Sequence, residues 1–156
     1  MATLRVEPLA RHREAIPLVA QWFIDEWPTW YGPDGPGNVA ADLEAFAASE
    51  QSLPVGLLLF EATVAIGAGA LKATSIPSHS HLTPWAAAGF VLPQHRGKGA
   101  GLFLLQELVG KARQLGYEHV YCGTSTAESL LVRAGWAAVA VTQLEGKDLT
   151  IFRSEA

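Results

Sequence analysis

A cluster of three glycines between a strand-like run and a long helical pattern constrains this chain more than any other feature. Gly97, Gly99 and Gly101 stand within five residues of sequence. Glycine lets the backbone turn left-handed and lets a ligand approach the main chain, and the first N–H groups of a helix have no partner within it. Arg96 and Lys98 add positive charge beside them. The sequence therefore predicts a phosphate-binding turn at the start of a helix.

Apolar spacing before this turn predicts strands and helices in a mixed order. The expected segments are a strand over 4–7, a helix over 12–26, a second helix from Asn38, a hairpin of 54–61 with 63–72, and a buried strand over 85–92. Gly67 and Gly69 predict a bulge or a close backbone approach in the hairpin. Asn38 is the expected N-cap, because its side chain can accept a first-turn N–H group.

Two irregular segments interrupt this pattern. Residues 28–37 are rich in proline and glycine, and Trp27, Trp30 and Tyr31 crowd the same region. We expect an aromatic-rich loop there. Residues 73–84 show no periodicity and predict a second loop.

The segments after the turn complete the pattern. The expected segments are a helix from Gly101 to Gly116, a strand over 117–123, a short helix capped by Thr126 that runs through Ala134, and a final hairpin of 136–144 with 149–153. Strand 85–92, the glycine turn, the helix and strand 117–123 form a βαβ crossover. The predicted fold class is therefore α/β with a mixed sheet.

Length and charge limit the possible classes of protein. A chain of 156 residues suits one domain, over 1–156, with a substantial core. The net charge of −4 argues against a general attraction to nucleic acid. The single cysteine, Cys122, cannot form an internal disulfide, and the first residues lack the apolar core of a secretory signal, so we expect a cytoplasmic protein. The longest uncharged run, 73–94, contains prolines, histidines and serines and does not predict a membrane span.

Two common phosphate-binding patterns do not fit the glycine turn. A Walker loop requires a glycine five residues before its Gly-Lys pair and a Ser or Thr after it, where this chain has Leu92 and Gly99. A dinucleotide fingerprint that starts at Gly97 requires a third glycine where Leu102 stands. Spacing therefore argues against an NTPase and a dinucleotide-binding enzyme.

The turn instead resembles the pyrophosphate-binding motif of the GNAT acetyltransferase superfamily, Gln/Arg-x-x-Gly-x-Gly/Ala after a Val-x-Pro segment. Residues 96–101 fit this motif, and Val91 and Pro93 precede it. Residues 131–136 resemble the second signature of the family. Segments 25–32 and 82–85 are similar to a bacterial branch of the superfamily, and the resemblance covers nearly the whole chain.

The resemblance implies the GNAT acyl-CoA N-acyltransferase fold, with a mixed, mostly antiparallel seven-stranded sheet, about four helices, and fourth and fifth strands that are parallel and splayed. It also implies acetyl-CoA as cosubstrate, with its pantetheine arm between the splayed strands. The cofactor-binding candidates are Phe90, Val91, Arg96, Gly97, Lys98, Gly99, Ala100, Gly101 and Leu102. The backbone of Val91 is the candidate contact for the thioester and its oxyanion, since N–H donors aimed at developing charge are a large catalytic term.

Two positions depart from the family pattern. Gly123 stands where many relatives carry a glutamate as general base, and Leu131 stands where many carry a tyrosine as general acid. The substitute candidates for acid or base are Glu26, His79, His81, Tyr121, Ser125 and Ser129. A dedicated acid is not essential, and the enzyme needs a base less if its acceptor amine is already weakly basic.

Candidate acceptor contacts come from the two irregular segments. They are Trp27, Trp30, Tyr31, His79, His81 and Trp85. His79 and His81 have no cysteine or carboxylate beside them, so we predict no metal site.

Two functions from different classes fit the sequence. The first is an N-acetyltransferase that moves an acetyl group from acetyl-CoA to a primary amine of a small molecule or peptide, by direct attack in a ternary complex. The second is a non-catalytic acyl-CoA-binding or sensing module, and transfer to an alcohol or of a longer acyl group would leave the same pattern. The final hairpin can pair with another copy, which makes a homodimer a further expectation.

Overall fold

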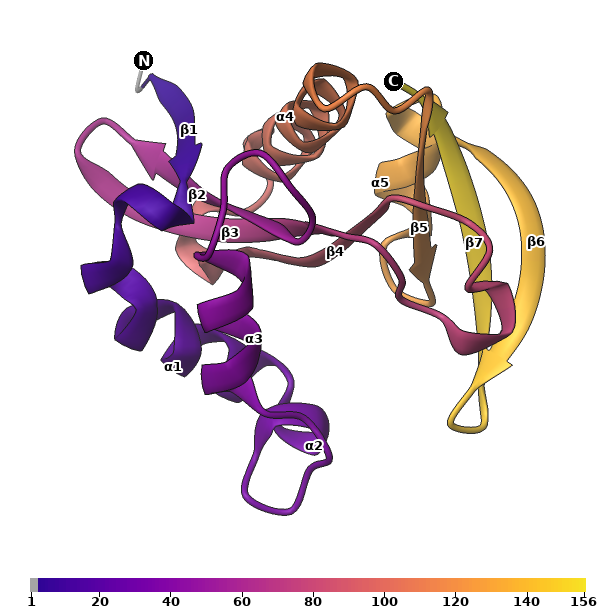
Figure 1. Ribbon diagram of the computed structural model, residues 1–156, viewed down its shortest axis with the longest axis horizontal. Coiled ribbons are helices and arrows are strands. Elements are labelled where there is room, and N and C mark those ends of the chain that lie inside the picture. The colour runs from indigo at the N-terminus through magenta and orange to yellow at the C-terminus, as the bar shows by residue number, and fades with distance from the viewer. Residues whose placement is uncertain (1–2) are drawn as a thin grey trace.

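A computed structural model describes residues 3–156 and has a single sheet at its centre (Figure 1). The sheet has seven strands in the order β1-β2-β3-β4-β5-β7-β6. Neighbouring strands are antiparallel except β4 and β5, which run parallel. The predicted α/β class with a mixed, mostly antiparallel sheet is confirmed. Residues 1 and 2 of the expected domain lie outside the described residues.

The strands are β1 (Leu4–Pro8), β2 (Val55–Glu61), β3 (Val64–Lys72), β4 (Trp85–Val91), β5 (His119–Thr124), β6 (Ala137–Leu144) and β7 (Lys147–Glu155). The five α-helices within residues 3–156 are α1 (Ile16–Glu26), α2 (Pro28–Tyr31), α3 (Val39–Phe46), α4 (Ala100–Gln114) and α5 (Glu128–Arg133). Short 3-10 turns are η1 (Leu9–Arg11), η2 (Arg13–Ala15), η3 (Pro77–His79) and η4 (Pro93–His95).

The first two long helices follow their sequence signals closely. α1 begins at Ile16, later than position 12, because the preceding residues form the turns η1 and η2. Pro17 therefore falls in the first turn, where its missing N–H removes no helical hydrogen bond. Asn38 caps α3 as predicted, since its side chain accepts the N–H of Ala41 at 3.0 Å.

Two predictions about short helices were wrong. The segment expected to be a loop, residues 28–37, opens with the helix α2, so residues 3–156 contain five α-helices where about four were expected. Thr126 does not cap α5. The N-cap is Ala127, which has no side-chain cap hydrogen bond. The N–H groups of Thr126 and Ala127 donate to the hydroxyl of Thr124, at 3.1 and 2.9 Å, and hold the chain between β5 and α5.

The turn between β6 and β7 is tighter than the four residues expected. Glu145 and Gly146 both have left-handed backbones, with φ of 53° and 80°. Two consecutive residues with positive φ form the two-residue hairpin turn whose twist suits antiparallel strands. Pairing therefore continues to Leu144 and Lys147, and β7 starts earlier than position 149.

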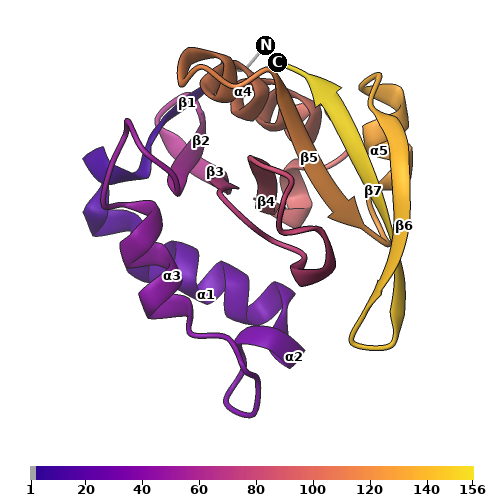
Figure 2. The same ribbon diagram turned by 45° about the vertical axis from the view of Figure 1, so that its right-hand side comes forward.

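Helices cover both faces of the sheet (Figure 2). Leu57 and Leu59 of β2 belong to the core cluster that contains α4, whereas Leu58 and Phe60 belong to the cluster that contains α1 and α3. Alternate strand residues point to opposite faces, so β2 is buried on both sides. Within residues 3–156 no α-helix is both long and apolar enough to cross a membrane.

Candidate functional site

The parallel strands β4 and β5 pair only at one end. Trp85 and Tyr121 are their single pair of Cα partners, and the N–H of Tyr121 donates to the carbonyl of Pro84 at 3.0 Å. Beyond this point the ribbons diverge (Figure 2). Within residues 3–156, the rest of the β5-facing edge of β4 therefore has no strand partner.

A bulge interrupts the pairing of β4 with β3, on the side of β4 away from the unpaired edge. Ala68 and Ala70 of β3 pair with Phe90 and Ala87, so β4 carries one extra residue opposite Gly69. The bulge expected in the second strand of the hairpin lies nearby in β3, where Ile66 is the extra residue between the partners of Leu59 and Phe60. The extra residue in β4 brings Ala88 to a φ of 54°, a left-handed conformation that costs a non-glycine residue roughly 1–3 kcal/mol.

The residue pattern around Ala88 does not by itself predict strain. Two signals surround it, because Gly89 follows it and Gly69 lies opposite the bulge in the neighbouring strand. Backbone strain of this kind gathers where main-chain groups are turned toward a ligand. The strained edge of β4 is therefore part of the candidate site.

The main chain of Val91 faces the unpaired side of β4. The N–H of the next residue, Leu92, donates to the carbonyl of Ile66 in β3 at 2.8 Å. Successive N–H groups of a strand point to opposite sides, so the N–H of Val91 points away from β3. Its carbonyl accepts a hydrogen bond from Nε of Arg96 at 2.7 Å, which leaves the N–H as the group directed at a ligand.

The glycine turn connects β4 through η4 to the first residue of α4. Gly97 and Gly99 have φ of 77° and 87°, and Gly99 is the N-cap of α4 without a side-chain cap. A Cβ added at either glycine would meet no atom within 4 Å, so conformation and not lack of space requires glycine there. Gly101 lies within the first turn of α4, and its added Cβ would touch Leu130 at 3.7 Å. The first N–H groups of α4 and the helix dipole make this turn an anion site.

The charged residues of the turn are placed differently from each other. Lys98 is exposed. Arg96 folds back, since its Nη2 lies 3.3 and 3.2 Å from the two carboxylate oxygens of Glu26, and its guanidinium lies 5.5 Å from the ring centre of Phe90. Glu26, a candidate base, is thus engaged in an ion pair at the end of α1.

A pocket of about 260 Å³ lies beside this ion pair. It is lined by Trp22, Asp25, Glu26, Phe90, Leu92 and Pro93. Trp22 and Phe90 stack with ring centres 5.4 Å apart. The pocket therefore has an aromatic wall and two carboxylates, and it adjoins the end of β4.

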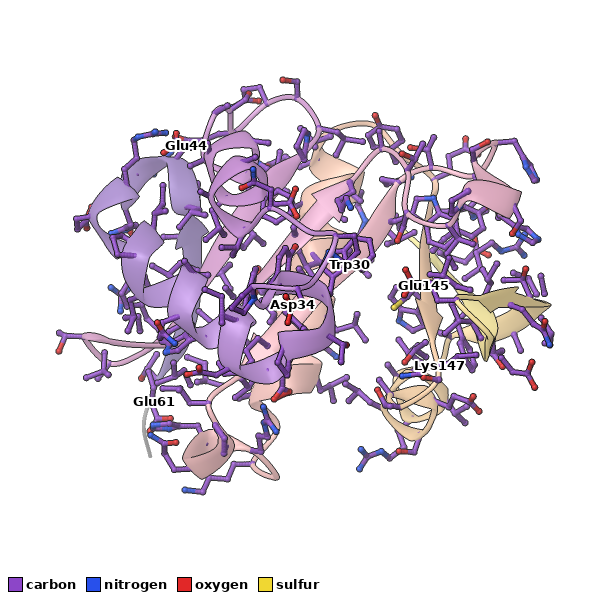
Figure 3. The ribbon with its side chains drawn as sticks, turned by 90° about the horizontal axis from the view of Figure 1, so that it is seen from below. Trp30, Asp34, Glu44, Glu61, Glu145 and Lys147 are labelled. Carbon is purple, nitrogen blue, oxygen red and sulfur yellow. The ribbon has the colours of Figure 1, made fainter. Side chains whose placement is uncertain are left out.

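The three aromatic residues around α2 differ in exposure. Trp27 is half-buried, and its ring lies 6.5 Å from that of Phe90. The Tyr31 hydroxyl donates to Asp42 at 2.6 Å, and burial together with this carboxylate raises the pKa of Tyr31 far above its usual value. Trp30 is 42% exposed, and in the view from below it lies on the same face of the molecule as Glu145 (Figure 3). Trp30 is therefore the aromatic side chain of this group with most surface for a substrate.

Of the candidate acceptor contacts in and just after the loop between β3 and β4, one lies in the core and two lie at the surface. Trp85 is fully buried against Ile76 and Ile151, and its indole N–H donates to the carbonyl of Leu82 at 2.7 Å. A side chain without exposed surface cannot contact an acceptor, so the expectation for Trp85 needs correction: it anchors the loop.

His79 and His81 have rings 5.9 Å apart, and the Ser78 hydroxyl lies 2.8 Å from Nδ1 of His79. His79 is half-buried and His81 is exposed. No group of three or more potential metal ligands occurs in the part of the chain from 3 to 156. The two histidines therefore form a polar surface feature next to η3.

The β5 candidates lie at different distances along the strand. Tyr121 is at the paired end, with its ring 5.8 Å from that of Trp85, whereas Ser125 is exposed just after the diverging end. A Cβ at Gly123 would collide with Ile76 from the 73–84 loop, and Leu131 is 2% exposed in the core. Apolar side chains thus occupy both places where a base and an acid were sought. Ser129 is exposed on α5.

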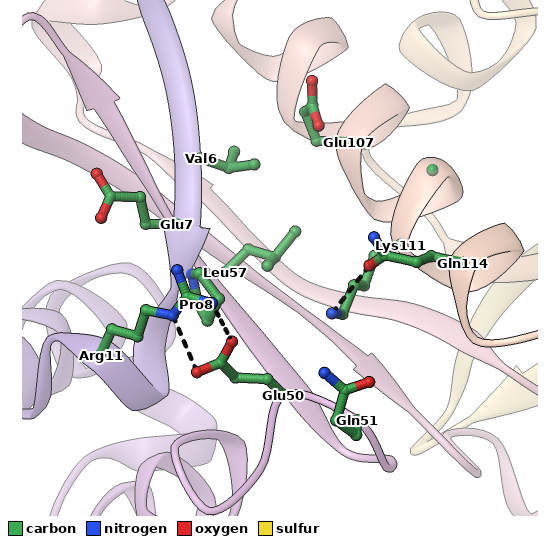
Figure 4. Close-up of a pocket in the computed structure, with 11 residues that line it drawn as sticks. Val6, Glu7, Pro8, Arg11, Glu50, Gln51, Leu57, Glu107, Lys111 and Gln114 are labelled. Atoms are coloured by element: carbon green, nitrogen blue, oxygen red, sulfur yellow. Dashed lines mark hydrogen bonds and ion pairs between the residues drawn. The ribbon is translucent and has the colours of Figure 1, made fainter.

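A larger pocket, of about 580 Å³, lies away from the glycine turn between β1 and the second half of α4 (Figure 4). Several of its charged groups already have partners. Arg11 holds Glu50 through two hydrogen bonds of 3.0 and 2.7 Å, and Lys111 donates to Gln114 at 3.1 Å. Its lining contains neither the turn nor the strained edge of β4, so it is a separate feature.

Comparisons with known proteins agree with this geometry. The model of the acetyltransferase (GNAT) family matches residues 17–133. No curated protein sequence matches the chain.

Solved structures share the fold at low identity. A Salmonella typhimurium protein solved with its cofactor acetyl-CoA is 18% identical, with a TM-score of 0.72 over 99% of this chain and 94% of its own. An aminoglycoside 6'-N-acetyltransferase complexed with coenzyme A is 11% identical, with a TM-score of 0.77 over 97% and 96%. Ribosomal-protein-alanine N-acetyltransferase from Brucella melitensis is 14% identical, with a TM-score of 0.71 over 99% of both chains.

Proposed function

Because the chain belongs to the acetyltransferase (GNAT) family, we propose that it transfers an acetyl group from acetyl-CoA to a primary amine of a small molecule or peptide. The observation that carries the proposal is the joint placement of a strained, unpaired β4 edge and a left-handed glycine turn at the start of α4. The whole chain, 1–156, acts as one acetyltransferase domain in this proposal.

The donor is held by main-chain groups. The N–H groups of 97–102 bind the diphosphate, because they lie at the start of α4 where few other partners compete for them. Phe90 and Val91 lie along the path of the pantetheine arm at the unpaired edge of β4. Lys98 is exposed beside the turn and adds a mobile positive charge.

The reaction is a direct attack within a ternary complex. The nitrogen lone pair of the acceptor attacks the thioester carbonyl carbon and forms the C–N bond. The resulting oxyanion receives a hydrogen bond from the N–H of Val91, which points toward the unpaired side. Collapse of the intermediate breaks the C–S bond, and the thiolate takes up a proton as the nitrogen loses one.

The acceptor class follows from the absence of a base at position 123. Deprotonation of a lysine-like amine, with a pKa near 10.4, costs about 4.6 kcal/mol at pH 7, whereas an α-amine near 8 costs only about 1.4. Gly123 and Leu131 supply no ionisable group. We therefore favour acceptors of low basicity, with Trp30, His79 and His81 as contacts.

Two measurements test this proposal. Acetyl-CoA should raise the melting temperature, because a ligand that binds only the folded state stabilises it. Thiol release on addition of an amine panel that includes peptides with free N-termini should then identify the acceptor class. Burial raises the pKa of the Cys122 thiol to about 12, so the enzyme itself adds little background to a thiol assay. No melting shift at millimolar acetyl-CoA would reject the proposal.

A second candidate is an acyl-CoA-binding module without turnover. It is favoured by Ile76, which fills the space beside Gly123, and by the buried Leu131. Binding without thiol release across the whole panel would support it. Alcohols and longer acyl-CoA thioesters belong in the same panel, since they distinguish O-acyl and longer-acyl transfer from N-acetylation.

A homodimer through the sheet edge is a related proposal. β6 is an edge strand without charged residues, and Val139 and Val141 are 43% and 73% exposed on it. Edge strands with apolar side chains and free backbone groups pair readily with another chain. Sedimentation of the wild type and of Val141→Lys would test it, because a charge on that edge should shift a dimer toward monomer.

A further inference from the structure

Arg96 joins three parts of the molecule directly before the glycine turn. Its Nε donates to the carbonyl of Val91, the last residue of β4, at 2.7 Å. Its Nη2 reaches both carboxylate oxygens of Glu26, the last residue of α1, at 3.3 and 3.2 Å. The guanidinium also lies 5.5 Å from the ring centre of Phe90. One side chain therefore ties α1 and β4 to the residue from which the turn starts.

This tie is the nearest side-chain restraint on the turn. Gly97 and Gly99 have no side chains, and the space beside their Cα atoms is open to 4 Å. Glycine loses more backbone freedom than any other residue when it is ordered. Arg96 is extended, with φ −79° and ψ 160°, and fixes the direction in which the chain enters the left-handed Gly97.

Glu26 has the geometry of a partner for Arg96 and not of a base. A general base needs an oxygen directed at the proton that it removes. Both oxygens of Glu26 face Nη2 of Arg96, and the pair spans 70 residues of sequence. The neighbouring carboxylate, Asp25, accepts a hydrogen bond from Gln21 at 2.8 Å within α1.

We propose that Glu26 is a positioning residue: it holds Arg96 against β4, and thereby keeps the glycine turn in the shape whose N–H groups bind the diphosphate of acetyl-CoA. This inference rests on the proposed function and specifies how the donor site is kept in shape. Acid–base chemistry at the amine is then left to groups other than Glu26.

The test compares Glu26→Gln with Asp25→Asn by calorimetric titration of coenzyme A. Both variants remove one negative charge from the same pocket, but only the first touches Arg96. The side chains of the pair are 45% and 34% exposed, so its loss should weaken binding by about threefold to fivefold. Asp25→Asn should leave the dissociation constant within about twofold of wild type.

Kinetics separate positioning from base catalysis. At saturating acetyl-CoA, Glu26→Gln should keep the wild-type kcat and the wild-type pH dependence of kcat, while the KM for acetyl-CoA rises. Loss of a general base would instead lower kcat by roughly a hundredfold or more and remove one limb of the pH profile.

A variant of the other partner, Arg96→Lys, keeps the inference testable if Glu26→Gln does not fold. Arg96→Lys keeps the charge but loses the planar fork that reaches the carbonyl and the carboxylate together, so it should weaken coenzyme A binding as well. The double variant should bind no more weakly than Arg96→Lys alone, because both changes break one interaction.

Three results would overturn the inference. Tighter binding by Glu26→Gln would mean that Glu26 competes with phosphate for Arg96. An equal loss in Asp25→Asn would mean that general charge is responsible, and a lost pH limb would make Glu26 the base. Failure of the wild type to bind coenzyme A would instead reject the proposed function itself.

Discussion

The donor side and the acceptor side of the proposed site differ in the groups that they offer to a ligand: main-chain N–H groups on the first and side chains on the second. The donor side consists of β4, the glycine turn and the start of α4, and it acts through main-chain N–H groups that two left-handed glycines and a strained alanine orient. The acceptor side consists of α2 and the 73–84 loop, and it presents side chains such as Trp30 and His79. A main-chain site depends on backbone conformation, whereas a side-chain site can change its chemistry by single substitutions. The donor is therefore expected to be fixed and the acceptor to be variable.

Gly99→Val is expected to have the largest effect, and it should act on the donor side alone. A β-branched residue at a φ of 87° costs about 2 kcal/mol, so the binding-competent turn should become rarer and the dissociation constant for coenzyme A should rise roughly thirtyfold. Calorimetric titration measures it. Gly116→Val is the matched control, because Gly116 has a φ of 97° beyond the far end of α4. That control should lose stability but keep its affinity, and equal losses of affinity in both variants would contradict the backbone argument.

Trp30→Ala tests the acceptor side alone. An aromatic contact that is 42% exposed is worth on the order of 1–2 kcal/mol to a ligand, so kcat/KM for the acceptor should fall about tenfold. The affinity for coenzyme A should stay unchanged. Val141→Ala, on the edge strand β6, provides an exposed apolar control that should alter neither constant. A loss of donor affinity in Trp30→Ala would show that the two sides are not separate.

Gly101→Ala tests whether the turn needs glycine to leave room for the ligand, as distinct from needing it for a left-handed backbone. Gly101 lies in α4 without the positive φ of Gly99, and its added Cβ meets only Leu130 at 3.7 Å. The free enzyme should gain roughly 0.5–1 kcal/mol of stability in a denaturation experiment. The new methyl group should nevertheless weaken coenzyme A about fivefold if the diphosphate approaches this backbone closely. Unchanged affinity would place the diphosphate elsewhere on the turn.

The smallest expected effect is a pH dependence of stability. It comes from Glu7 and His12, which belong to neither the donor side nor the acceptor side of the site. A hydrogen bond with Glu7 raises the pKa of His12 above its ordinary 6.5, and the same bond lowers the pKa of Glu7 below 4.5. The contribution of His12 to stability is thus present below pH 6.5 and lost as pH rises through its raised pKa. That of Glu7 is present above pH 4.5 and lost as pH falls through its lowered pKa.

Urea unfolding as a function of pH checks this window. Stability due to the pair should be greatest between pH 4.5 and 6.5, and His12→Gln should flatten the curve there. An unflattened curve would assign the pH dependence to other groups. The measurement also helps the comparison of the donor and acceptor sides, because pH effects on protein stability can then be separated from pH effects on acetyl transfer.

Local signals in the sequence were sufficient for the backbone of the glycine turn, the cap of α3 and the β2–β3 hairpin. Three glycines with fixed spacing, the apolar periodicity of α4 and the capping residue Asn38 each act within a few residues, and the structure confirms the cap and the left-handed turn. The hairpin of β2 and β3 and its bulge followed from similar short-range patterns. Backbone conformation is largely a local property, so it could be predicted.

The remaining features depend on contacts between distant segments. Arg96 meets Glu26 across 70 residues, and the burial of Trp85 depends on Ile76 and on Ile151 of β7. The periodicity of apolar residues in the sequence does not predict such contacts. Ala127 and not Thr126 is the N-cap of α5, and the Thr124 hydroxyl at the end of β5 accepts the N–H groups of Thr126 and Ala127. The role of a side chain near the acceptor could therefore be assigned only after the fold was known.

Hydrogen–deuterium exchange with and without acetyl-CoA tests the central claim most directly, since it reports individual main-chain N–H groups on both sides of the site. We expect acetyl-CoA to slow exchange at residues 97–102 and at Val91, and to leave residues 28–37 unchanged until an acceptor amine is added. Slowed exchange at 28–37 with no change at the glycine turn would contradict the account.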